Sequence, residues 1–291
     1  MRDDSPSDTA ILIARSILLA SKDPFLGRLV ADQEPEILKR ILNCAWFDRA
    51  TDFRQVRQIL FGIERLLIPG IIAHYLVRKR RIELAVREAV AAGVSQVVVL
   101  GAGFDTLAWR LHTEFPQLSF VEIDHYATQT VKLQALEARA NIHFLPLDLA
   151  KEPLAAYLRA CPAFSLDRPS IFIAEGLTMY LSAERVGAVM RDIAGLAGRL
   201  VFTFMERDDS GSIGFHGENP FVARWLRWRS EPFLWGISRQ DLIPLLADAG
   251  LGHPVISDDK ILRESILVPL DLGEIPLARG ECVCICSPVS R

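Results

Sequence analysis

Four short apolar runs of the sequence end on residues that could bind a polar ligand. The run VVVL ends at the Gly-Ala-Gly loop of residues 101–103, and later runs end at Asp124, at Asp148 in LPLD and at Glu175 in IAEG. Glycines let a ligand approach the backbone closely, and an acid about 20 residues after such a loop can accept hydrogen bonds from ribose hydroxyls. Each residue alone is typical of a turn or a helix cap. Four consecutive run ends of this kind indicate a nucleoside site.

The loop differs from a dinucleotide-binding loop at two positions. A dinucleotide fingerprint has a third glycine where this chain has Thr106. Asp105 places a negative charge where a diphosphate would lie. S-adenosylmethionine carries a sulfonium, an ammonium group and no phosphate, so an acidic loop favours it over NAD. The three acids that follow fit the same ligand, because its ribose hydroxyls, adenine amino group and ammonium group are hydrogen-bond donors.

The elements that must position these residues are strands alternating with helices. Buried apolar strands in such an alternation predict a parallel sheet covered on both faces, which is a doubly wound α/β fold. Ligands of such sheets lie outside the carboxyl ends of the strands, so the four run ends should meet at one edge. Runs rich in β-branched and aromatic residues predict strands at 96–103, 118–124, 142–148, 170–176 and 199–204.

The chain of 291 residues is expected to form a single domain. Residues 1–92 have helical patterning and predict a helical N-terminal cap, and 93–291 predict the sheet-containing core. A lid is expected at about 207–238, over an apolar or aromatic acid, because large aromatics and arginines alternate there. The aromatics are Phe221, Trp225, Trp228, Phe233 and Trp235.

Composition narrows the classes of partner and the location. The net charge of −3, with acids and bases interspersed, lacks the basic footprint of a nucleic-acid binder. The beginning, MRDDSPSD, is unlike a secretory signal, and no stretch has the 18 uninterrupted apolar residues of a membrane span. We therefore expect a cytoplasmic protein with a small-molecule substrate, without a nucleic-acid or membrane partner.

The cysteines favour a buried strand over a disulfide framework or a metal site. The chain has five cysteines, and an odd number argues against a disulfide framework. In ECVCIC, Cys282, Cys284 and Cys286 alternate with apolar residues. This spacing places the three sulfurs on one face of a buried strand and lacks the Cys-x-x-Cys turn of a typical metal site.

Several segments, in order, resemble the leucine carboxyl methyltransferase family and its bacterial branch, which is related to the tetracenomycin polyketide O-methyltransferases. They are LVRKRRIELAVREAVAAGVSQVVVLGAGFDTLAWRL, FVEIDHYATQTVKLQAL, FLPLDL and FIAEGLTMYL, with further likeness in SDTA and EPFLWGIS. The likeness covers roughly residues 5 to 250. It implies a class I, Rossmann-like S-adenosylmethionine-dependent methyltransferase with a seven-stranded sheet, a helical N-terminal addition and an inserted lid.

The resemblance implies a role for individual residues. Arg78 falls where the family has an arginine that holds the methionine carboxylate, and Asp124 matches the acid that binds the ribose. Asp148, with Leu149 beside it, matches the acid near adenine. Glu175 begins the family's E-G-x-x-x-Y-L motif near the methionine portion. The predicted cofactor-binding set is Arg78, Gly101, Ala102, Gly103, Asp105, Glu122, Asp124, Asp148, Leu149 and Glu175.

Tyr180 ends the same motif and is the predicted catalytic residue. It resembles the tyrosine that faces the methyl-accepting group in carboxyl methyltransferases. At Leu107 the chain departs from the bacterial branch, which commonly has an arginine there in D-T-R-A. Any contact of that arginine is therefore not carried over to this chain.

The sequence predicts an S-adenosylmethionine-dependent O-methyltransferase acting on a carboxylate or hydroxyl of a small, hydrophobic or polyketide-like molecule. Methyl transfer from a sulfonium mainly requires alignment and the exclusion of water. A carboxylate acceptor needs no base, whereas a hydroxyl acceptor usually does. His125 and His216 are candidates for that base. A structural role is the more common one for a lone histidine.

Two alternatives belong to other classes. A nicotinamide-dependent oxidoreductase is disfavoured by the missing third glycine. The pair Tyr75 and Lys79, which has the Tyr-x-x-x-Lys spacing of a short-chain reductase, precedes the glycine loop and so has the wrong order. A module that binds S-adenosylmethionine without turnover is the other alternative, because Leu107 interrupts the family pattern.

Overall fold

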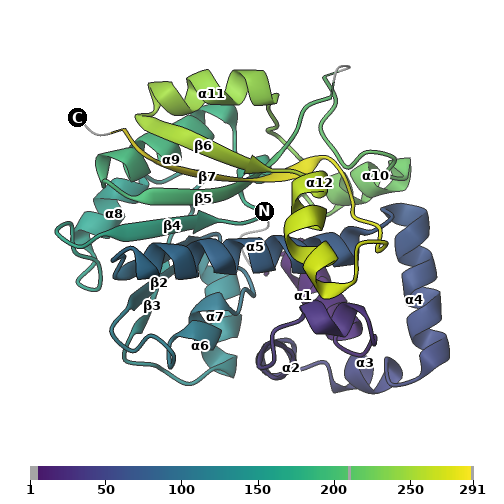
Figure 1. Ribbon diagram of the computed structural model, residues 1–291. Helices are drawn as coiled ribbons and strands as arrows, with labels where there is room; N and C mark the ends of the chain where they lie inside the picture. The colour runs from purple at the N-terminus through teal and green to yellow at the C-terminus, as the bar shows by residue number, and fades with distance from the viewer. Residues whose placement is uncertain (1–5, 209–210, 290–291) are drawn as a thin grey trace.

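A seven-stranded sheet forms the centre of the computed structural model, which describes residues 6–208 and 211–289 (Figure 1). The strand order is β3–β2–β1–β4–β5–β7–β6. Strands β1 to β5 pair in parallel, whereas β7 is antiparallel to both of its neighbours. The predicted doubly wound, mostly parallel sheet is confirmed. Its strands are β1 Gln96–Leu100, β2 Ser119–Asp124, β3 Ile142–Pro146, β4 Ser170–Ala174, β5 Arg199–Met205, β6 Leu251–Ser257 and β7 Glu281–Pro288.

The apolar runs that predicted the strands are buried from both sides. Every residue of β1 and of β4 is buried. Successive side chains of a strand point to opposite faces. Accordingly, Val97 and Val99 belong to one apolar core, and Val98 and Leu100 belong to the core on the other face. A continuous apolar run at β1 is thus what two covered faces require.

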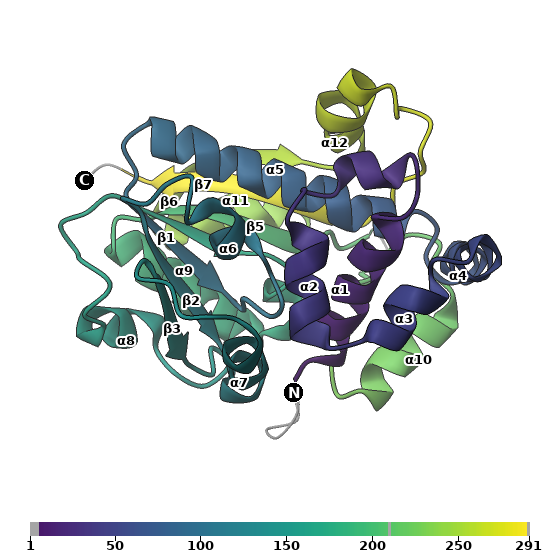
Figure 2. The same cartoon turned by 90° about the horizontal axis from the view of Figure 1, so that it is seen from below.

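Helices supply the other half of each core. Apolar residues of α1, α5 and α6 join the core on one face, and those of α8, α9 and α11 join the core on the other. Figure 2 shows α5 running along the sheet with α1 and α2 beside its end. The helices are α1 Asp8–Ala20, α5 Ile71–Ala91, α6 Leu107–Leu111, α7 Tyr126–Ala135, α8 Leu154–Ala160, α9 Ala183–Gly195 and α11 Arg239–Asp248.

The remaining helices include a group at one end of the molecule. Helices α3, α4 and α10 lie at this end in both views (Figures 1 and 2), although α10 comes from the segment after β5. The backbone N–H of Asn219, the cap of α10, donates to the carbonyl of Leu67 at the end of α4 over 2.8 Å. The bounds are α2 Glu34–Leu42, α3 Ala45–Ala50, α4 Arg54–Leu67, α10 Pro220–Trp228 and, between β6 and β7, α12 Asp259–Leu262.

The cysteine-rich run forms β7, as its alternation predicted. Cys282, Cys284 and Cys286 are all buried in the same core. Across residues 6–208 and 211–289, no three His, Cys, Asp or Glu residues are grouped as metal ligands would be.

No single helix in the described ranges is long and apolar enough to cross a membrane. Helices α4 and α5 together have the length and apolar composition of a span, but the chain bends by 86° between them.

Candidate active site

A cavity of about 340 Å³ lies at the carboxyl ends of β1, β2 and β4. Its floor consists of residues 99–105, Asp124, residues 147–151 and Glu175. Its roof comes from α1 and from residues 230–234, which follow α10. The structure therefore brings the predicted glycine loop and the three predicted acids to one cavity, because the strand ends meet at one edge of the sheet.

The glycine loop needs its glycines for conformational reasons. Gly101 and Gly103 have φ values of 61° and 48°, in the left-handed region that disfavours other residues. A Cβ on Gly101 would also lie 2.9 Å from the side chain of Leu177. The backbone N–H of Gly103 donates to Asp124 Oδ2 over 2.5 Å. The loop thus leaves backbone bare at the cavity and fixes the acid at the end of β2.

Asp124 is oriented by two backbone donors. Besides Gly103, the N–H of His125 donates to its Oδ1 over 2.5 Å. Its side chain is nearly buried, and this burial raises the pKa of the Asp124 carboxyl, although the two backbone hydrogen bonds oppose the rise. A carboxylate oxygen has two lone pairs. Each oxygen of Asp124 therefore keeps an acceptor site that can face the cavity.

Asp148 and Leu149 follow β3 at the neighbouring part of the floor. Asp148 accepts from the backbone N–H of Ala150 over 3.0 Å and pairs with Lys151 over 3.0 Å. Burial opposes its ionisation, but the hydrogen bond from Lys151 keeps the pKa of Asp148 below its usual value. Leu149 is buried and lines the cavity. The pair offers one charged and one apolar contact.

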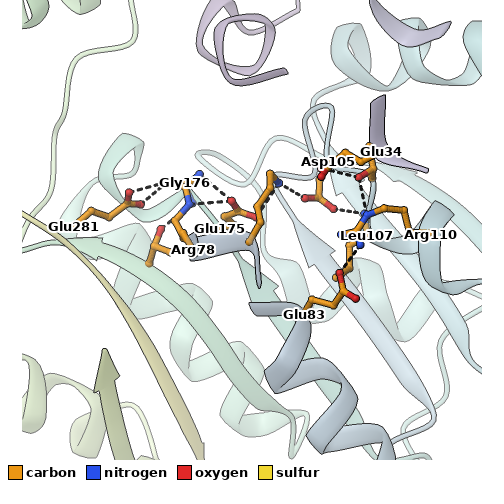
Figure 3. Close-up of polar contacts among 12 residues, drawn as sticks. Glu34, Arg78, Glu83, Asp105, Leu107, Arg110, Glu175, Gly176 and Glu281 are labelled. Atoms are coloured by element: carbon orange, nitrogen blue, oxygen red, sulfur yellow. Dashed lines mark hydrogen bonds and ion pairs between the residues drawn. The ribbon is translucent and has the colours of Figure 1, made fainter. Parts of the chain in front are cut away.

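A chain of ion pairs lies beside the glycine loop, and Figure 3 shows Arg78 between Glu281 and Glu175. Arg78 Nη1 lies 2.7 Å from Glu281 Oε2, and Arg78 Nη2 lies 2.8 Å from Glu175 Oε1. Lys79 continues the chain, with its Nζ 3.2 Å from Glu175 Oε2 and 2.5 Å from Asp105 Oδ2. Charges from α5, β7 and two strand ends are therefore already matched within the protein.

Two predicted roles change in view of this network. Arg78 lines the cavity, as the resemblance implies, but its guanidinium already binds two carboxylates. Asp105 also lines the cavity, yet its carboxylate binds Lys79 and accepts from the backbone N–H of Leu107 over 2.7 Å. Lys79 holds the pKa of the Asp105 carboxyl well below its usual value, although burial opposes this. The negative charge that was expected to select a cationic ligand is largely neutralised by Lys79.

Glu122 is outside the residues that line the cavity. It lies in the middle of β2, 1% exposed, and pairs with Lys132 Nζ over 2.6 Å. Lys132 also donates to the carbonyl of Asp105 over 2.5 Å. Burial raises the pKa of Glu122 to about 6, although Lys132 opposes the rise. The pair holds the glycine loop through the carbonyl of Asp105, and neither side chain lines the cavity.

Tyr180 also lines the cavity, beside the roof residue Thr9. Its ring packs on Phe233 with centroids 5.7 Å apart, and burial raises the pKa of its phenol, although a hydrogen bond with Thr9 opposes this. The hydroxyl of Thr9 donates to the carboxylate of Glu231. The backbone N–H groups of Asp8 and Thr9 donate to Glu231 as well, over 3.2 and 3.1 Å. Glu231 thus joins the start of α1 to the segment after α10, next to Tyr180.

The two histidines proposed as bases differ in location. His125 lines the cavity, and its Nδ1 accepts from the backbone N–H of Ala127 over 3.4 Å at the start of α7. His216 is exposed and does not line the cavity. His125 therefore acts as a helix cap at the cofactor end, and the structure does not bring His216 to the site.

The large aromatic residues of the expected lid do not line the cavity. Phe221 and Trp228 are exposed, and Trp235 is buried in the core that also contains Cys282. The residues of this segment that line the cavity are Ser230, Glu231, Pro232 and Leu234. The lid expected at about 207–238 stays a prediction, and its exposed rings on α10, Phe221 and Trp228, lie away from the cavity. The apolar wall comes instead from Ala10, Ile13, Ala14, Ile17, Leu177 and Leu181.

Leu107 begins α6 and is buried in the core beneath the glycine loop. It does not line the cavity. Near it, Arg110 donates to Thr106 Oγ1 over 3.0 Å and pairs with Glu83 (Figure 3). A core residue, Leu107, thus stands where the bacterial branch commonly has an arginine, and we assign no cofactor contact to it.

The residues that sequence reasoning missed are mostly partners of the predicted ones. Glu281, Lys79 and Lys132 complete ion pairs, and Thr9 and Glu231 form the roof next to Tyr180. A lone acid in the apolar run ECVCIC was the available signal for Glu281. Nothing local in the sequence connects Thr9 with Glu231.

Comparison with known proteins agrees with the fold and shows the family. The leucine carboxyl methyltransferase family profile matches residues 14–194. A Mycolicibacterium gilvum protein named as an S-adenosyl-L-methionine-dependent methyltransferase is 31% identical over 193 residues, which cover 65% of this chain and 62% of that protein. A Mycobacterium marinum protein with the same name is 25% identical over 293 residues, covering 89% and 92% of the two chains.

The crystal structure of a Thermobifida fusca methyltransferase has the same fold. Its TM-score is 0.58 at 18% identity, and the match covers 87% of this chain and 94% of that one. The family profile covers more than half of the residues of this chain. The chain therefore belongs to the leucine carboxyl methyltransferase family and is an S-adenosylmethionine-dependent methyltransferase.

Proposed function

We propose that this enzyme methylates an oxygen atom, a hydroxyl or a carboxylate, of a small hydrophobic or polyketide-like molecule. The observation that carries the proposal is that the glycine loop, Tyr180 and a set of aliphatic side chains line one cavity. The floor offers polar groups suited to a nucleoside, and the roof offers aliphatic side chains around one phenol. In this proposal residues 207–238 act as the lid, through their stretch 230–234, and the enzyme works in the cytoplasm.

The floor residues fit S-adenosylmethionine, which supplies a methyl group on a cationic sulfur when bound. Asp124 has free acceptor sites for the ribose hydroxyls, and Leu149 and Asp148 stand where an apolar and a polar edge of adenine could lie. Gly101 and Gly103 leave the backbone open to a close approach. Glu175 keeps a lone pair on Oε2 for an ammonium group, because both Nε and Nη2 of Arg78 contact Oε1 whereas Lys79 contacts Oε2.

Arg78 acts by holding Glu175 in position in this proposal. Its guanidinium is bound on both sides, so a ligand carboxylate would have to share the donors now used by Glu281 and Glu175. Releasing one of these buried carboxylates would be costly, because an unpaired buried charge is strongly unfavourable. We therefore assign Arg78 first to the architecture of the site and second to any carboxylate of the cofactor.

The roof residues place the acceptor. Tyr180 can hydrogen-bond the acceptor oxygen, and Ile13, Ile17 and Leu177 exclude water from it. Holding two reacting groups in line can contribute roughly 7 to 11 kcal/mol to a bimolecular step. Positioning and desolvation are thus the main contributions asked of this end of the cavity.

One observation favours a hydroxyl over a carboxylate acceptor. Glu231 lines the cavity next to Tyr180, and its carboxylate is held by the hydroxyl of Thr9 and by the backbone N–H groups of Asp8 and Thr9. A carboxylate acceptor would meet the negative charge of Glu231, whereas the O–H group of a phenol or enol could donate a hydrogen bond to it.

The experiment has two arms. Calorimetry with S-adenosylmethionine, S-adenosylhomocysteine and NADPH should show heat from the first two only, and heat from NADPH alone would overturn the assignment of the cavity. Incubation with methyl-labelled S-adenosylmethionine and matched phenols and carboxylic acids should label the phenols. Label in the carboxylic acids alone would contradict the preference for a hydroxyl, and tight cofactor binding without any labelled product would favour a binding module.

A further inference from the structure

We propose that helices α3, α4 and α10 form a docking surface for an anionic lipid membrane. The surface, called here the arginine–aromatic face, consists of exposed apolar residues and the arginines among them. The apolar residues are Trp46, Phe53, Ile59, Ile63, Leu66, Phe221 and Trp228. The arginines are Arg49, Arg54, Arg57, Arg65, Arg224 and Arg227.

Helix α4 is the main element of this face. None of its residues is buried, although half of them are apolar. Ile59, Ile63 and Leu66 are spaced by four and three residues and therefore share one side of the helix. Their exposed fractions are 63%, 47% and 75%. A helix of a globular protein normally turns such a stripe to the core, so this stripe lacks its partner in the described chain.

Helix α10 adds the aromatic part. Phe221 and Trp228 are 57% and 66% exposed, and Arg224 lies between them at helical spacing. The hydrogen bond from Asn219 to Leu67 joins the start of α10 to the end of α4. Figures 1 and 2 both place α3, α4 and α10 at the same end of the molecule. The three helices that carry the exposed apolar side chains thus lie at one end of the molecule.

The face is basic, although the chain is acidic overall. Residues 45–67 and 220–229 contain seven arginines and three acids, while the whole chain has a net charge of −3. Two of the acids, Asp48 and Asp52, already pair with Lys22 over 2.8 and 2.7 Å. Among the described residues, no carboxylate forms an ion pair with Arg54, Arg65, Arg224 or Arg227.

This charge decides between two occupants of the face. A second copy of the chain, docked symmetrically, would bring the same arginines against one another. An anionic lipid surface has the complementary charge, and arginine with tryptophan and aliphatic side chains is the composition of helices that lie in a membrane interface. Tryptophan also favours the level of the lipid headgroups. The face therefore fits a membrane that the protein lies on without crossing it.

The arginine–aromatic face lies next to the acceptor end of the cavity, so docking could bring the acceptor to the enzyme. This link between docking and the acceptor rests on the proposed function. Ser230, Glu231 and Pro232 line the cavity directly after α10. A membrane contact through Trp228 would place the acceptor end of the cavity at the lipid surface. The acceptor class would then be a lipophilic hydroxyl compound that partitions into lipid. In this point the proposal differs from the expectation drawn from the sequence, which is a protein without a membrane partner.

The test is co-sedimentation of the full chain with vesicles, without cofactor or acceptor. Vesicles of phosphatidylcholine mixed equally with phosphatidylglycerol should bind the protein at least about tenfold more tightly than phosphatidylcholine alone, and added salt should weaken this binding. Two double variants, Ile59→Ser with Leu66→Ser and Arg224→Glu with Arg227→Glu, should each reduce binding about tenfold or more. Leu166→Ser and Arg159→Glu are matched controls at exposed positions outside the face and should bind as the unmodified chain does.

Three results would overturn the proposal. One is the absence of binding to anionic vesicles, and another is equal binding with and without phosphatidylglycerol. The third is a dimer, seen by light scattering, in a chain that does not bind vesicles. If the Ile59→Ser with Leu66→Ser variant converts this dimer to a monomer, the face belongs to a second copy. Because vesicle binding is measured without turnover, its failure leaves methyl transfer untouched. Failure of methyl transfer with intact vesicle binding would refute only the proposed function.

Discussion

The two ends of the cavity are built in different ways. At the cofactor end, the glycine loop, Asp124, Asp148 and Glu175 come from one stretch, residues 99–176, whose parallel strands deliver them to the same edge of the sheet. The acceptor end joins Thr9 to Glu231, which are 222 residues apart in the chain. The first end depends on the strand order and the second on a long-range contact between a helix and a loop.

The difference shows where specificity can change. The cofactor end is fixed by the sheet and by buried ion pairs, so a substitution there alters the stability or the cofactor affinity. The acceptor end rests on α1 and on residues 230–234, so it can change without disturbing the sheet. We therefore expect large effects on folding at the cofactor end and smaller effects, confined to turnover, at the acceptor end.

The largest expected effect concerns Arg78. Arg78→Met removes the guanidinium beside the buried Glu281 and one of the two cations beside Glu175. Breaking a buried pair in this way costs about 3 to 5 kcal/mol. Urea unfolding should show this loss in the free energy of unfolding. Arg81→Met on the same helix is the control, because its pair with Glu88 is partly exposed and 3.8 Å long, and it should cost less than about 1 kcal/mol. Equal losses in the two variants would refute the view that this end depends on a buried network.

The next effect is a loss of stability in acid. Burial opposes ionisation, but Arg78 lowers the pKa of Glu281 from 4.5 to about 2. Because this pKa is depressed in the folded state, the stabilisation is present above pH 4.5 and is lost as the pH falls toward 2. The expected loss in the free energy of unfolding is about 3 kcal/mol, and urea unfolding at several pH values across this range measures it.

The control for the acid effect is the Glu281→Gln variant, which removes the titrating group. It should be less stable at neutral pH and should lose less stability between pH 4.5 and 2 than the unmodified chain. A pH dependence identical to that of the unmodified chain would assign the acid sensitivity to other carboxylates.

A smaller effect is expected at Asp124. Asp124→Ala should weaken S-adenosylmethionine binding by about 1 to 3 kcal/mol, because a hydrogen-bonded charged partner is removed. Calorimetry measures the affinity, and circular dichroism checks that the fold is retained. Asp167→Ala, at an exposed position after α8, should leave the affinity unchanged. An unchanged affinity in Asp124→Ala would mean that the ribose lies elsewhere.

The smallest effect belongs to the acceptor end. Tyr180→Phe should reduce turnover about tenfold, the value of one hydrogen bond near 1.4 kcal/mol, with little change in cofactor affinity. Tyr157→Phe on α8 is the control and should keep full turnover. A weakened cofactor affinity in Tyr180→Phe would place Tyr180 at the cofactor end and remove the distinction between the two ends.

Much of the fold could be predicted from the sequence, because buried parallel strands have a local signal. The run VVVL predicted β1, and the acid at the end of each following run lies where the sheet rule places it. The place of β7 between β5 and β6 has no such signal. The alternation in ECVCIC indicates a buried strand, but it contains nothing that fixes the direction of that strand or its neighbours.

The candidate site was predicted less completely, because partners far apart in the chain have no local signal. Arg78 and Glu281 are 203 residues apart, so the sequence does not show that a carboxylate already neutralises the charge of Arg78. Asp105 was interpreted by its charge alone, without Lys79. The aromatic residues of α10 were interpreted as a lid because composition does not tell which side of a helix faces the cavity.

The most direct test is a crystal structure with S-adenosylhomocysteine and a bound phenol. We predict the ribose hydroxyls on Asp124, the adenine beside Leu149 and the phenol oxygen within hydrogen-bond distance of Tyr180, under Thr9 and Glu231. A ribose bound away from Asp124, or a sulfur atom separated from Tyr180 by the glycine loop, would contradict this assignment of the two ends.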